Sequence, residues 1–393
     1  MKKNFYLPLA LFLIALVVVS SISYGYSVTV KDALNRVVVI KTIPKRVISL
    51  SPSITEIMAS LGLLNKLVGV DSISYKDPYY GISEYCKTHN VTDVGGYWWS
   101  AIKTEKIIAL KPDLVLADAG AHYKLLKFFE DYNLTVVYLH AGAARSIEDI
   151  YTDIATVAQI FNVSSTRVSE VIQSIENNIT VARQFLAPYK SIRAVVVVGF
   201  YEGIWVAGKA TFIDDLLSKI GVTNVATTVG WKAVNIETLA SWKPQIIILD
   251  TSYYNNKTLT EYGLTKLNAK LVFLSKSEID MLSRPGPLIG RAALMLAQRI
   301  ASVLGPAPTP TPITKTMVKT STVTNTVSYT VTKTNTVTKT STTTMTKEFA
   351  SATTIVKTHT ETIEKTPYGL IAGISIAVIL LGIAIGYLIS KRH

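Results

Sequence analysis

The stretch TEKIIALKPDLVLAD (Thr104–Asp118) nearly recurs as IETLASWKPQIIILD (Ile236–Asp250). In both copies a glutamate stands near the start of a short helical pattern, a Lys-Pro pair ends that pattern, and an apolar run closes on aspartate. Proline cannot continue a helix, and a short apolar run after such a break is typical of a buried strand. Each copy therefore predicts a helix followed by a strand, and the wide separation of the copies predicts two similar lobes.

Strand and helix patterns alternate around each copy. The apolar run Val47–Leu50 predicts a strand, and Ser53 with Glu56 forms an S-x-x-E capping box that predicts the start of the next helix. A hairpin is predicted over SVTVKDALNRVVVI (Ser27–Ile40), in which DALN supplies the turn. The second half begins with the strand-like RAVVVVGFYEGIWVAG (Arg193–Gly208). Alternation of this kind indicates an α/β fold with mainly parallel sheets.

One long helical pattern, Ser164–Leu186, separates the two halves. A helix of this length spans about 33 Å, which is enough to connect two lobes as a rigid spine. A surface helix within one lobe would show the same spacing. We expect a ligand cleft between two lobes joined by this helix. The apolar residues at helical spacing are Val168, Val171, Ile172, Ile175 and Ile179.

Both ends of the chain carry long apolar segments. Met1–Ser23 joins two lysines to an apolar core, as a secretory signal does, although a retained N-terminal anchor shares these features. Tyr368–Ser390 is 23 residues without a charge, and as a helix it would span about 35 Å, enough to cross a bilayer. Lys391 and Arg392 follow at once, so the positive-inside rule places the C-terminus in the cytoplasm. A single-pass protein of the cell membrane with an extracellular ectodomain is expected.

A Thr-rich run lies between the body and this segment, and we predict an extended stalk that is a candidate for O-glycosylation. Its period-two alternation is also compatible with a strand, but no apolar face is present to bury. The expected organisation is a signal peptide at 1–26, an N-terminal lobe at 27–163, a connecting helix at 164–188, a C-terminal lobe at 189–305, a stalk at 306–366, a transmembrane helix at 367–390 and a cytoplasmic tail at 391–393.

Composition narrows the function further. Cys86 is the only cysteine, so an intrachain disulfide is impossible. The net charge of +13 comes largely from the two ends and the Thr-rich run, and the body lacks the Arg-rich stripe that nucleic-acid binding needs. Five N-x-S/T sequons predict glycosylated loops, at Asn90, Asn133, Asn162, Asn178 and Asn256.

The motifs RVISLSPSITEIMASLG (Arg46–Gly62), IIALKPDLVLAD (Ile107–Asp118) and RPGPLIGRAALMLAQRIA (Arg284–Ala301) occur in this order. Together they resemble the helical-backbone class of extracytoplasmic solute-binding proteins, which serve ABC importers of vitamin B12, iron siderophores and haem. The resemblance covers roughly Val28 to Leu304. It implies a metal-chelate ligand and an ABC permease dimer as partners, with cobalamin as the first guess and a ferric siderophore close behind.

The resemblance also implies a role for the duplicated glutamates. In this family each lobe presents an acidic residue to one permease subunit, and in cobalamin-binding members that glutamate lies six residues after a ligand-facing tryptophan. Trp99 precedes Glu105 by six residues, and Trp231 precedes Glu237 by six. Glu105 and Glu237 are therefore the candidates for permease docking. The alternative is a glutamate that only complements the dipole of its helix.

Aromatic residues are the ligand-binding candidates, because flat rings suit a large chelate. The resemblance implies that Trp99 and Trp231 face the cleft, with Trp98 as the neighbour that competes with Trp99. Tyr75 matches an aromatic of the family's ligand-side loop, and Trp205 is a further candidate. Each of these side chains has the alternative of packing into the core.

Among the charged residues, Arg284 is a candidate for holding an anionic chelate, with a capping or surface arginine as the alternative. The histidines show no close-spaced metal-ligand motif. His122 follows LVLAD near the expected cleft and is a candidate to ligate a haem iron, with a solvated loop histidine as the alternative. No P-loop, G-x-S-x-G or Rossmann glycine set is present, so we expect a binding protein with no enzymatic activity and no cofactor. A surface adhesion or structural protein with a binding head, or a haem-binding receptor, is the alternative function.

Overall fold

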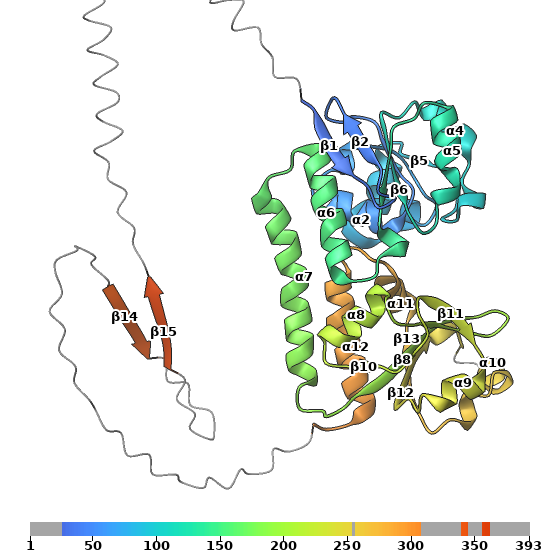
Figure 1. Ribbon diagram of the computed structural model, residues 1–393, viewed down its shortest axis with the longest axis vertical. Coiled ribbons are helices and arrows are strands. Elements are labelled where there is room, and N and C mark those ends of the chain that lie inside the picture. The colour runs from blue at the N-terminus through green and yellow to red at the C-terminus, as the bar shows by residue number, and fades with distance from the viewer. Residues whose placement is uncertain (1–25, 254–255, 308–338, 345–355, 362–393) are drawn as a thin grey trace, which may run out of the picture. The chain divides into compact units, whose positions relative to one another are not determined.

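The computed structural model describes residues 26–253, 256–307, 339–344 and 356–361 (Figure 1). The chain divides into two units, Met1–Ile313 and Thr314–His393. The predicted transmembrane helix and, apart from Tyr26, the predicted signal peptide lie outside the described residues. Among the residues that are described, none of the helices combines the length and the apolar character that a membrane span requires.

The N-terminal lobe is built on a five-stranded parallel sheet with the order β5-β4-β3-β6-β7. All five residues of β6 are buried, because helices cover both faces. Leu114 and Leu116 join one core with α2 and α6, whereas Val115 and Ala117 join another with α4 and α5. The elements are β3 (Val47–Ser49), α2 (Pro52–Ser60), β4 (Leu67–Val70), α3 (Ile82–Thr88), β5 (Thr92–Asp93), α4 (Thr104–Leu110), β6 (Leu114–Asp118), α5 (Leu126–Asp131), β7 (Val136–Leu139) and α6 (Ile147–Phe161), preceded by the hairpin of β1 (Val28–Lys31) and β2 (Val37–Ile40).

Helix α2 begins differently from the sequence prediction. Its N-cap is Ser51, which makes no side-chain capping bond, and Pro52 occupies the first helical position, where its missing N–H costs nothing. The side chain of Ser53 pairs with the Ser51 hydroxyl at 3.1 Å, and Glu56 bonds to Arg284 instead of to the backbone. The predicted capping box was therefore wrong, because Glu56 is turned into the protein.

The C-terminal lobe has a six-stranded sheet with the order β11-β9-β8-β12-β13, and β10 pairs with β8. Strands β8, β10, β12 and β13 are parallel, whereas β9 and β11 extend the sheet in antiparallel fashion. The α/β prediction with mainly parallel sheets is confirmed. The elements are β8 (Arg193–Phe200), β9 (Ile204–Ala207), α8 (Phe212–Lys219), β10 (Thr223–Asn224), β11 (Trp231–Val234), α9 (Ile236–Ser241), β12 (Ile246–Asp250), α10 (Asn256–Glu261), β13 (Lys270–Leu274), α11 (Lys276–Ser283) and α12 (Ile289–Leu304).

The sequence repeat corresponds to a repeated structural unit. Helix α4 leads into strand β6 in the first copy, and α9 leads into β12 in the second, as the repeat predicts. The helix stop is also repeated, because Lys111 and Lys243 both have positive φ, at 46° and 48°. Each lysine precedes its proline, so the same backbone reversal delivers both apolar runs into the sheets.

Helix α7 (Ser165–Leu186) is the predicted long helix, and Ser164 caps it by accepting from the Arg167 N–H. It runs alongside both lobes and packs on α12 (Figure 1). Gly290 permits a close approach there, since a Cβ at this position would lie 2.8 Å from Ile175 Cα. One buried apolar cluster continues from α2 and α6 through α7 to α12. The lobes therefore share a packed junction, which limits their relative movement to small shifts.

Three of the five sequon asparagines end helices, in addition to being candidates for glycosylation. Asn90, Asn133 and Asn162 are exposed and have φ of 53°, 51° and 52°. Each lies just beyond a helix, and asparagine is one of the few residues that adopt this left-handed conformation readily. The helix ends α3, α5 and α6 therefore account for asparagine at these positions.

In the second unit, β14 (Lys339–Thr344) pairs with β15 (Val356–Glu361) in antiparallel register, with Lys339 opposite Glu361. Both strands lie within the predicted stalk. The expectation of a stalk without strands, based on the lack of an apolar face, is therefore wrong for these two segments. Threonine favours extended backbone, and ladder hydrogen bonds do not require a buried face.

Candidate functional site

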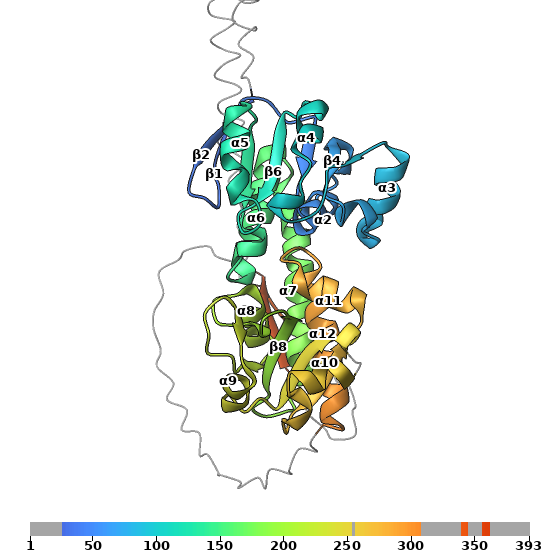
Figure 2. The ribbon, with the colours of Figure 1, turned by 90° about the vertical axis from the view of Figure 1, so that its right-hand side faces the viewer.

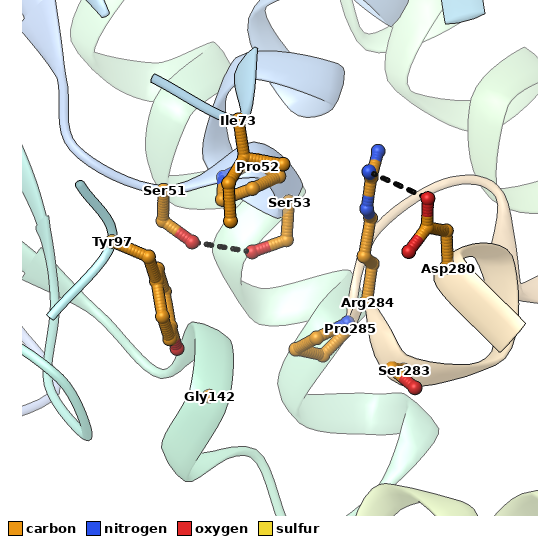
Figure 3. A pocket seen from close by; sticks show the side chains of 10 residues that line it. All are labelled: Ser51, Pro52, Ser53, Ile73, Tyr97, Gly142, Asp280, Ser283, Arg284 and Pro285. Atoms are coloured by element: carbon orange, nitrogen blue, oxygen red, sulfur yellow. Dashed lines mark hydrogen bonds and ion pairs between the residues drawn. The ribbon is translucent and has the colours of Figure 1, made fainter. Parts of the chain in front are cut away.

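A pocket of about 200 Å³ lies between the two lobes (Figure 3). The N-terminal lobe supplies residues that follow strands β3, β4, β5 and β7, at the carboxyl edge of its sheet. The C-terminal lobe supplies the end of α11 and the loop before α12. In parallel α/β sheets this edge is the usual place for a ligand. The lining residues are Ser51, Pro52, Ser53, Ile73, Tyr97 and Gly142 from the first lobe, and Asp280, Ser283, Arg284 and Pro285 from the second.

A larger hollow of about 710 Å³ adjoins the pocket and shares Ile73, Asp280 and Arg284 with it. Both lobes again contribute to its walls, through the segments 72–79 and 275–277. Tyr79 ties the two together, because its hydroxyl donates to the Ser277 carbonyl at 2.9 Å. Pocket and hollow form one interlobe cleft, whose size lies in the usual range of ligand-binding sites.

Arg284 crosses the cleft from one lobe to the other. One of its guanidinium nitrogens donates to Glu56 Oε1 at 2.9 Å and to Asp77 Oδ2 at 2.7 Å, and both carboxylates belong to the N-terminal lobe. Asp280 Oδ2 lies 3.6 Å from the other terminal nitrogen. Buried charges are tolerated when they are paired in this way. The candidate anion-binding arginine lines the pocket, but its charge is already matched by carboxylates.

The acidic partners of this cluster hold their protons more tightly than usual. Burial raises the pKa of Glu56 to about 8, and the Arg284 guanidinium only partly offsets that effect. Oε2 of Glu56 is buried without a hydrogen-bond partner among the described residues. Burial also raises the pKa of Asp71 to about 6, although the Ser74 hydroxyl and backbone N–H groups oppose it. The pKa of Asp77 is raised for the same reason.

The structure has two α/β lobes, a spine helix and an interlobe cleft. A comparison of the sequence with known protein families gives a result that fits this architecture. Residues 47–267 match the periplasmic binding protein family. The chain belongs to this family. The match includes the first-lobe wall of the cleft, and ends before the α11–α12 segment that carries Arg284.

Relatives of this periplasmic binding protein include the uncharacterized ABC transporter substrate-binding lipoprotein YvrC of Bacillus subtilis, 28% identical over 283 residues, which are 70% of this chain and 86% of YvrC. The vitamin B12-binding protein of Yersinia pestis is 26% identical over 275 residues, 69% of this chain and 90% of its own. A possible iron-binding periplasmic protein from Staphylococcus epidermidis, of known structure, is 26% identical, covers 66% of this chain and 99% of its own, and superposes with a TM-score of 0.54.

The predicted tryptophans of the first lobe of this periplasmic binding protein lie beside the pocket and do not line it. Trp98 is 61% exposed and meets the Tyr97 ring edge-on at 5.2 Å between centroids. Trp99 is 40% exposed, and Lys124 Nζ lies 4.7 Å from the centroid of its ring. Tyr97 is the ring of the GYWW segment that faces the pocket.

The other aromatic candidates are half-buried. Trp205 of β9 is paired with Ala233, and Trp231 of β11 with Ala207, so the two indoles share one face of the β9–β11 ladder. Trp205 donates its indole N–H to the Tyr201 carbonyl at 2.8 Å, and Trp231 packs on Phe212 at 5.8 Å. Neither lines the pocket or the adjoining hollow.

Tyr75 also lies off these walls. It sits in a short 3-10 turn, Ser74–Lys76, and packs against the core. Ile73 from the same loop lines the pocket in its place. The structure thus brings only Arg284, of the six ligand candidates, onto the pocket wall.

The candidate docking residues are both exposed and occupy equivalent places. Glu105 lies in the first turn of α4, and Glu237 in the first turn of α9. In Figures 1 and 2, helices α4 and α9 lie on the side of their lobes that faces away from α7. The repeat therefore places the two helices that carry these glutamates on the same side of the molecule.

His122 has neither of the roles considered for it. It is fully buried, its Nδ1 accepts from the Asp118 backbone N–H at 3.0 Å, and its Nε2 lies 2.6 Å from the Tyr97 carbonyl, to which it donates. Both ring nitrogens are occupied, and burial lowers the pKa of the imidazole. The residue is structural and is not free to ligate haem iron. No cluster of three or more metal-ligating side chains occurs within the described ranges.

Tyr97 and Ile73 are two of the lining residues that sequence reasoning missed. A signal existed for Tyr97, because it follows Gly95 and Gly96, and Gly95 has φ of 109°. That turn is closed by the bridge between Gly95 and Ile102. Glycine in such a conformation marks a tightly folded loop, and the first aromatic after it has its direction fixed by the turn. For Ile73, a partly exposed aliphatic residue, no distinctive sequence signal is present.

Proposed function

We propose that this chain is the substrate-binding protein of an ABC importer and that it captures a bulky metal chelate in the interlobe cleft. The observation that carries the proposal is the cleft itself, because the two lobes of a periplasmic binding protein both contribute side chains to one pocket. Relatives named for vitamin B12 binding and for ABC transport support this choice of class.

The charge distribution favours a chelate without a strong negative charge. The Arg284 guanidinium is paired with Glu56 and Asp77, and Asp280 adds a further carboxylate at the pocket wall. An anionic ferric siderophore would meet this surplus of acid. A corrinoid would instead contact Tyr97, Ile73 and the proline side chains, whose flat or apolar surfaces suit it. Cobalamin is therefore the first candidate, and a ferric siderophore is second.

The two glutamates complete the proposal. Glu105 and Glu237 would each meet a cationic pocket on one subunit of an ABC permease dimer, because they are exposed and project from equivalent helices. Exposed carboxylates at a rim govern association more than affinity. The predicted membrane helix at 367–390, which lies outside the described residues, would anchor the protein near its permease at high local concentration.

Titration of the purified ectodomain, residues 27–305, tests the ligand class. Cyanocobalamin, ferric enterobactin (an anionic tris-catecholate) and haemin would be added separately, and binding followed by calorimetry and by tryptophan fluorescence. We expect saturable one-to-one binding of cyanocobalamin, weaker binding of ferric enterobactin and none of haemin at His122. Absence of saturable binding with all three would refute chelate capture, and preference for ferric enterobactin would reverse the order proposed from the charges.

A further inference from the structure

Asp118, at the end of β6, lies behind the pocket wall and is fully buried. Its Oδ2 accepts from the Tyr97 hydroxyl at 2.7 Å and from the Gly142 backbone N–H at 3.0 Å, and Ser51 Oγ lies 3.5 Å away. Tyr97, Gly142 and Ser51 all line the pocket, on the side opposite Arg284 (Figure 3). One hidden carboxylate oxygen therefore connects three separate parts of the first-lobe wall.

The other oxygen of Asp118 has an ordinary structural task. Oδ1 accepts from the backbone N–H groups of Gly120 at 2.7 Å and Ala121 at 3.1 Å, which closes the turn after the strand. The matched residue in the second copy of the repeat, Asp250, makes the same kind of bond to the Ser252 N–H at 2.7 Å. The turn explains why both copies end on aspartate. It does not explain the bond from Asp118 to an aromatic hydroxyl at the pocket.

The packing around Oδ2 leaves Tyr97 little freedom. A Cβ on Gly142 would lie 2.6 Å from the Tyr97 hydroxyl and 3.0 Å from Asp118 Oδ2. Only glycine therefore permits the close approach of this turn to the phenol. The backbone of Tyr97 is fixed as well, because its carbonyl accepts from His122, whose other nitrogen is held by the Asp118 N–H. Both ends of the tyrosine thus depend on the Asp118 turn.

We propose that Asp118 is a positioning residue of the binding site: it holds the Tyr97 ring at one place and angle on the pocket wall, so that the ring is ready to contact a flat chelate. The positioning role depends on the proposed function in one respect, the choice of a metal chelate as the ligand. A ring that is already fixed loses no further side-chain freedom on binding, so the fixed position raises affinity for ligands that match it. Both copies of the repeat have the aspartate for its turn, and in the first lobe the Oδ2 atom of Asp118 also positions a ring of the binding site.

The first test measures binding with whichever of cyanocobalamin, ferric enterobactin and haemin saturates the wild-type ectodomain. We expect D118N and Y97F each to weaken binding about tenfold, because each breaks the charge-assisted bond to Oδ2. The double variant D118N/Y97F should be no weaker than D118N, since both act through one contact. D250N is the matched control and should stay within about twofold of wild type. Multiplicative losses in the double variant, or equal losses in D250N, would overturn the proposal.

A second test needs no ligand. The ¹³Cζ signal of Tyr97 in labelled tyrosine, assigned by its absence in Y97F, would be recorded by NMR at neutral pH. The Tyr97 hydroxyl donates to Asp118 Oδ2 at 2.7 Å, so D118N, which removes the charge of the acceptor, should shift this signal. An unchanged signal would show that Asp118 does not hold the phenol. G142A should displace the Tyr97 hydroxyl while Asp118 remains in place. This variant replaces D118N in the test if D118N does not fold.

The two tests separate two kinds of failure. If the wild type binds none of the chelates and D118N still releases Tyr97, then the proposed ligand class is wrong and the positioning role stands. If the wild type binds a chelate and D118N, Y97F and G142A bind it equally well, then the positioning role is wrong and the ligand class stands.

Discussion

Arg284 and Glu56 lie 228 positions apart in the chain and meet at 2.9 Å in the interlobe cleft. The side chain of Glu56 is 0% exposed and that of Arg284 is 10% exposed. The same guanidinium nitrogen also lies 2.7 Å from Asp77 Oδ2. Arg284 of the second lobe therefore contacts two acidic side chains of the first lobe. The strength of these contacts follows from burial, because water screens these charges little.

The first prediction concerns removal of this arginine. Arg284→Met keeps much of the side-chain volume but leaves the buried Asp77 carboxylate without a cation and the Glu56 carboxyl group without its hydrogen-bond donor, so we expect the free energy of unfolding to fall by about 3–5 kcal/mol. Urea denaturation would measure it. Arg299→Met is the matched control, because Arg299 is 49% exposed in its pair with Glu278, and its loss should cost no more than about 1 kcal/mol. Similar losses in both variants would mean that the Arg284 cluster contributes nothing special.

The second prediction concerns pH. The pKa of Glu56 is raised from 4.5 to about 8 in the folded chain, so between these values the folded state keeps a proton that the unfolded state has lost. Stability should therefore fall as the pH rises through this window. Glu56→Gln removes the titration, and its stability should fall less between pH 5 and 8 than that of the wild type.

Asp71 titrates in both proteins and provides the internal control, because its raised pKa of about 6 affects them equally at lower pH. Denaturation midpoints measured at half-unit pH steps would give the two profiles. Parallel profiles for the wild type and Glu56→Gln above pH 6 would show that Glu56 is ionised throughout, as a strong pair with Arg284 would require.

The third prediction concerns the junction of α7 and α12. Alanine is a better helix former than glycine by about 0.8–1.0 kcal/mol, yet Gly290→Ala would place a methyl group 2.8 Å from Ile175 Cα. We expect the clash to dominate and to destabilise the protein by about 1–3 kcal/mol. Gly199→Ala, where an added Cβ meets nothing within 4 Å, should change stability by no more than about 0.5 kcal/mol. A more stable Gly290→Ala protein would show that the helices have room to separate.

The fold could be read from the sequence because its main signals are local. The Lys-Pro stop, the apolar runs and the long helical spacing each act within a few residues, and α4 and α7 lie where these patterns place them. The repeat predicted the two lobes, and the resemblance to a known family added the expectation of a metal-chelate ligand. Lys111 and Lys243 show how closely a repeated sequence can repeat a backbone conformation.

The site was harder to predict because it depends on contacts between distant residues. Glu56 has the spacing of a capping box, and only the approach of Arg284 from the other lobe shows that it is a buried partner instead. Similarly, the only local signal among the three adjacent aromatic residues is the glycine turn before Tyr97, and it does not show that Trp98 and Trp99 face outward. That choice is made by Asp118 and Gly142, which lie in other loops.

The fourth prediction concerns the docking glutamates. Replacing both Glu105 and Glu237 with alanine should leave chelate affinity within about twofold of wild type, because neither side chain lines the cleft. Stimulation of ATP hydrolysis by the cognate permease, reconstituted in vesicles, should be lost. Glu176→Ala is the control, because this exposed glutamate lies on α7, away from α4 and α9. Lost chelate affinity in the double variant would show that these glutamates contribute to the ligand site.

The last prediction ranks the three neighbouring rings of the first lobe by their distance from the pocket. Tyr97→Leu removes a ring from the pocket wall and should weaken chelate binding at least tenfold, since aromatic anchors in a cleft carry much of the binding energy. Trp98→Leu removes the edge contact with that ring and should have a smaller effect. Trp99→Leu removes a ring that contacts Lys124, so its effect should be the smallest. Dissociation constants for the same chelate would establish the order, and a larger loss for Trp99→Leu than for Tyr97→Leu would mean that the bound protein turns this indole toward its ligand.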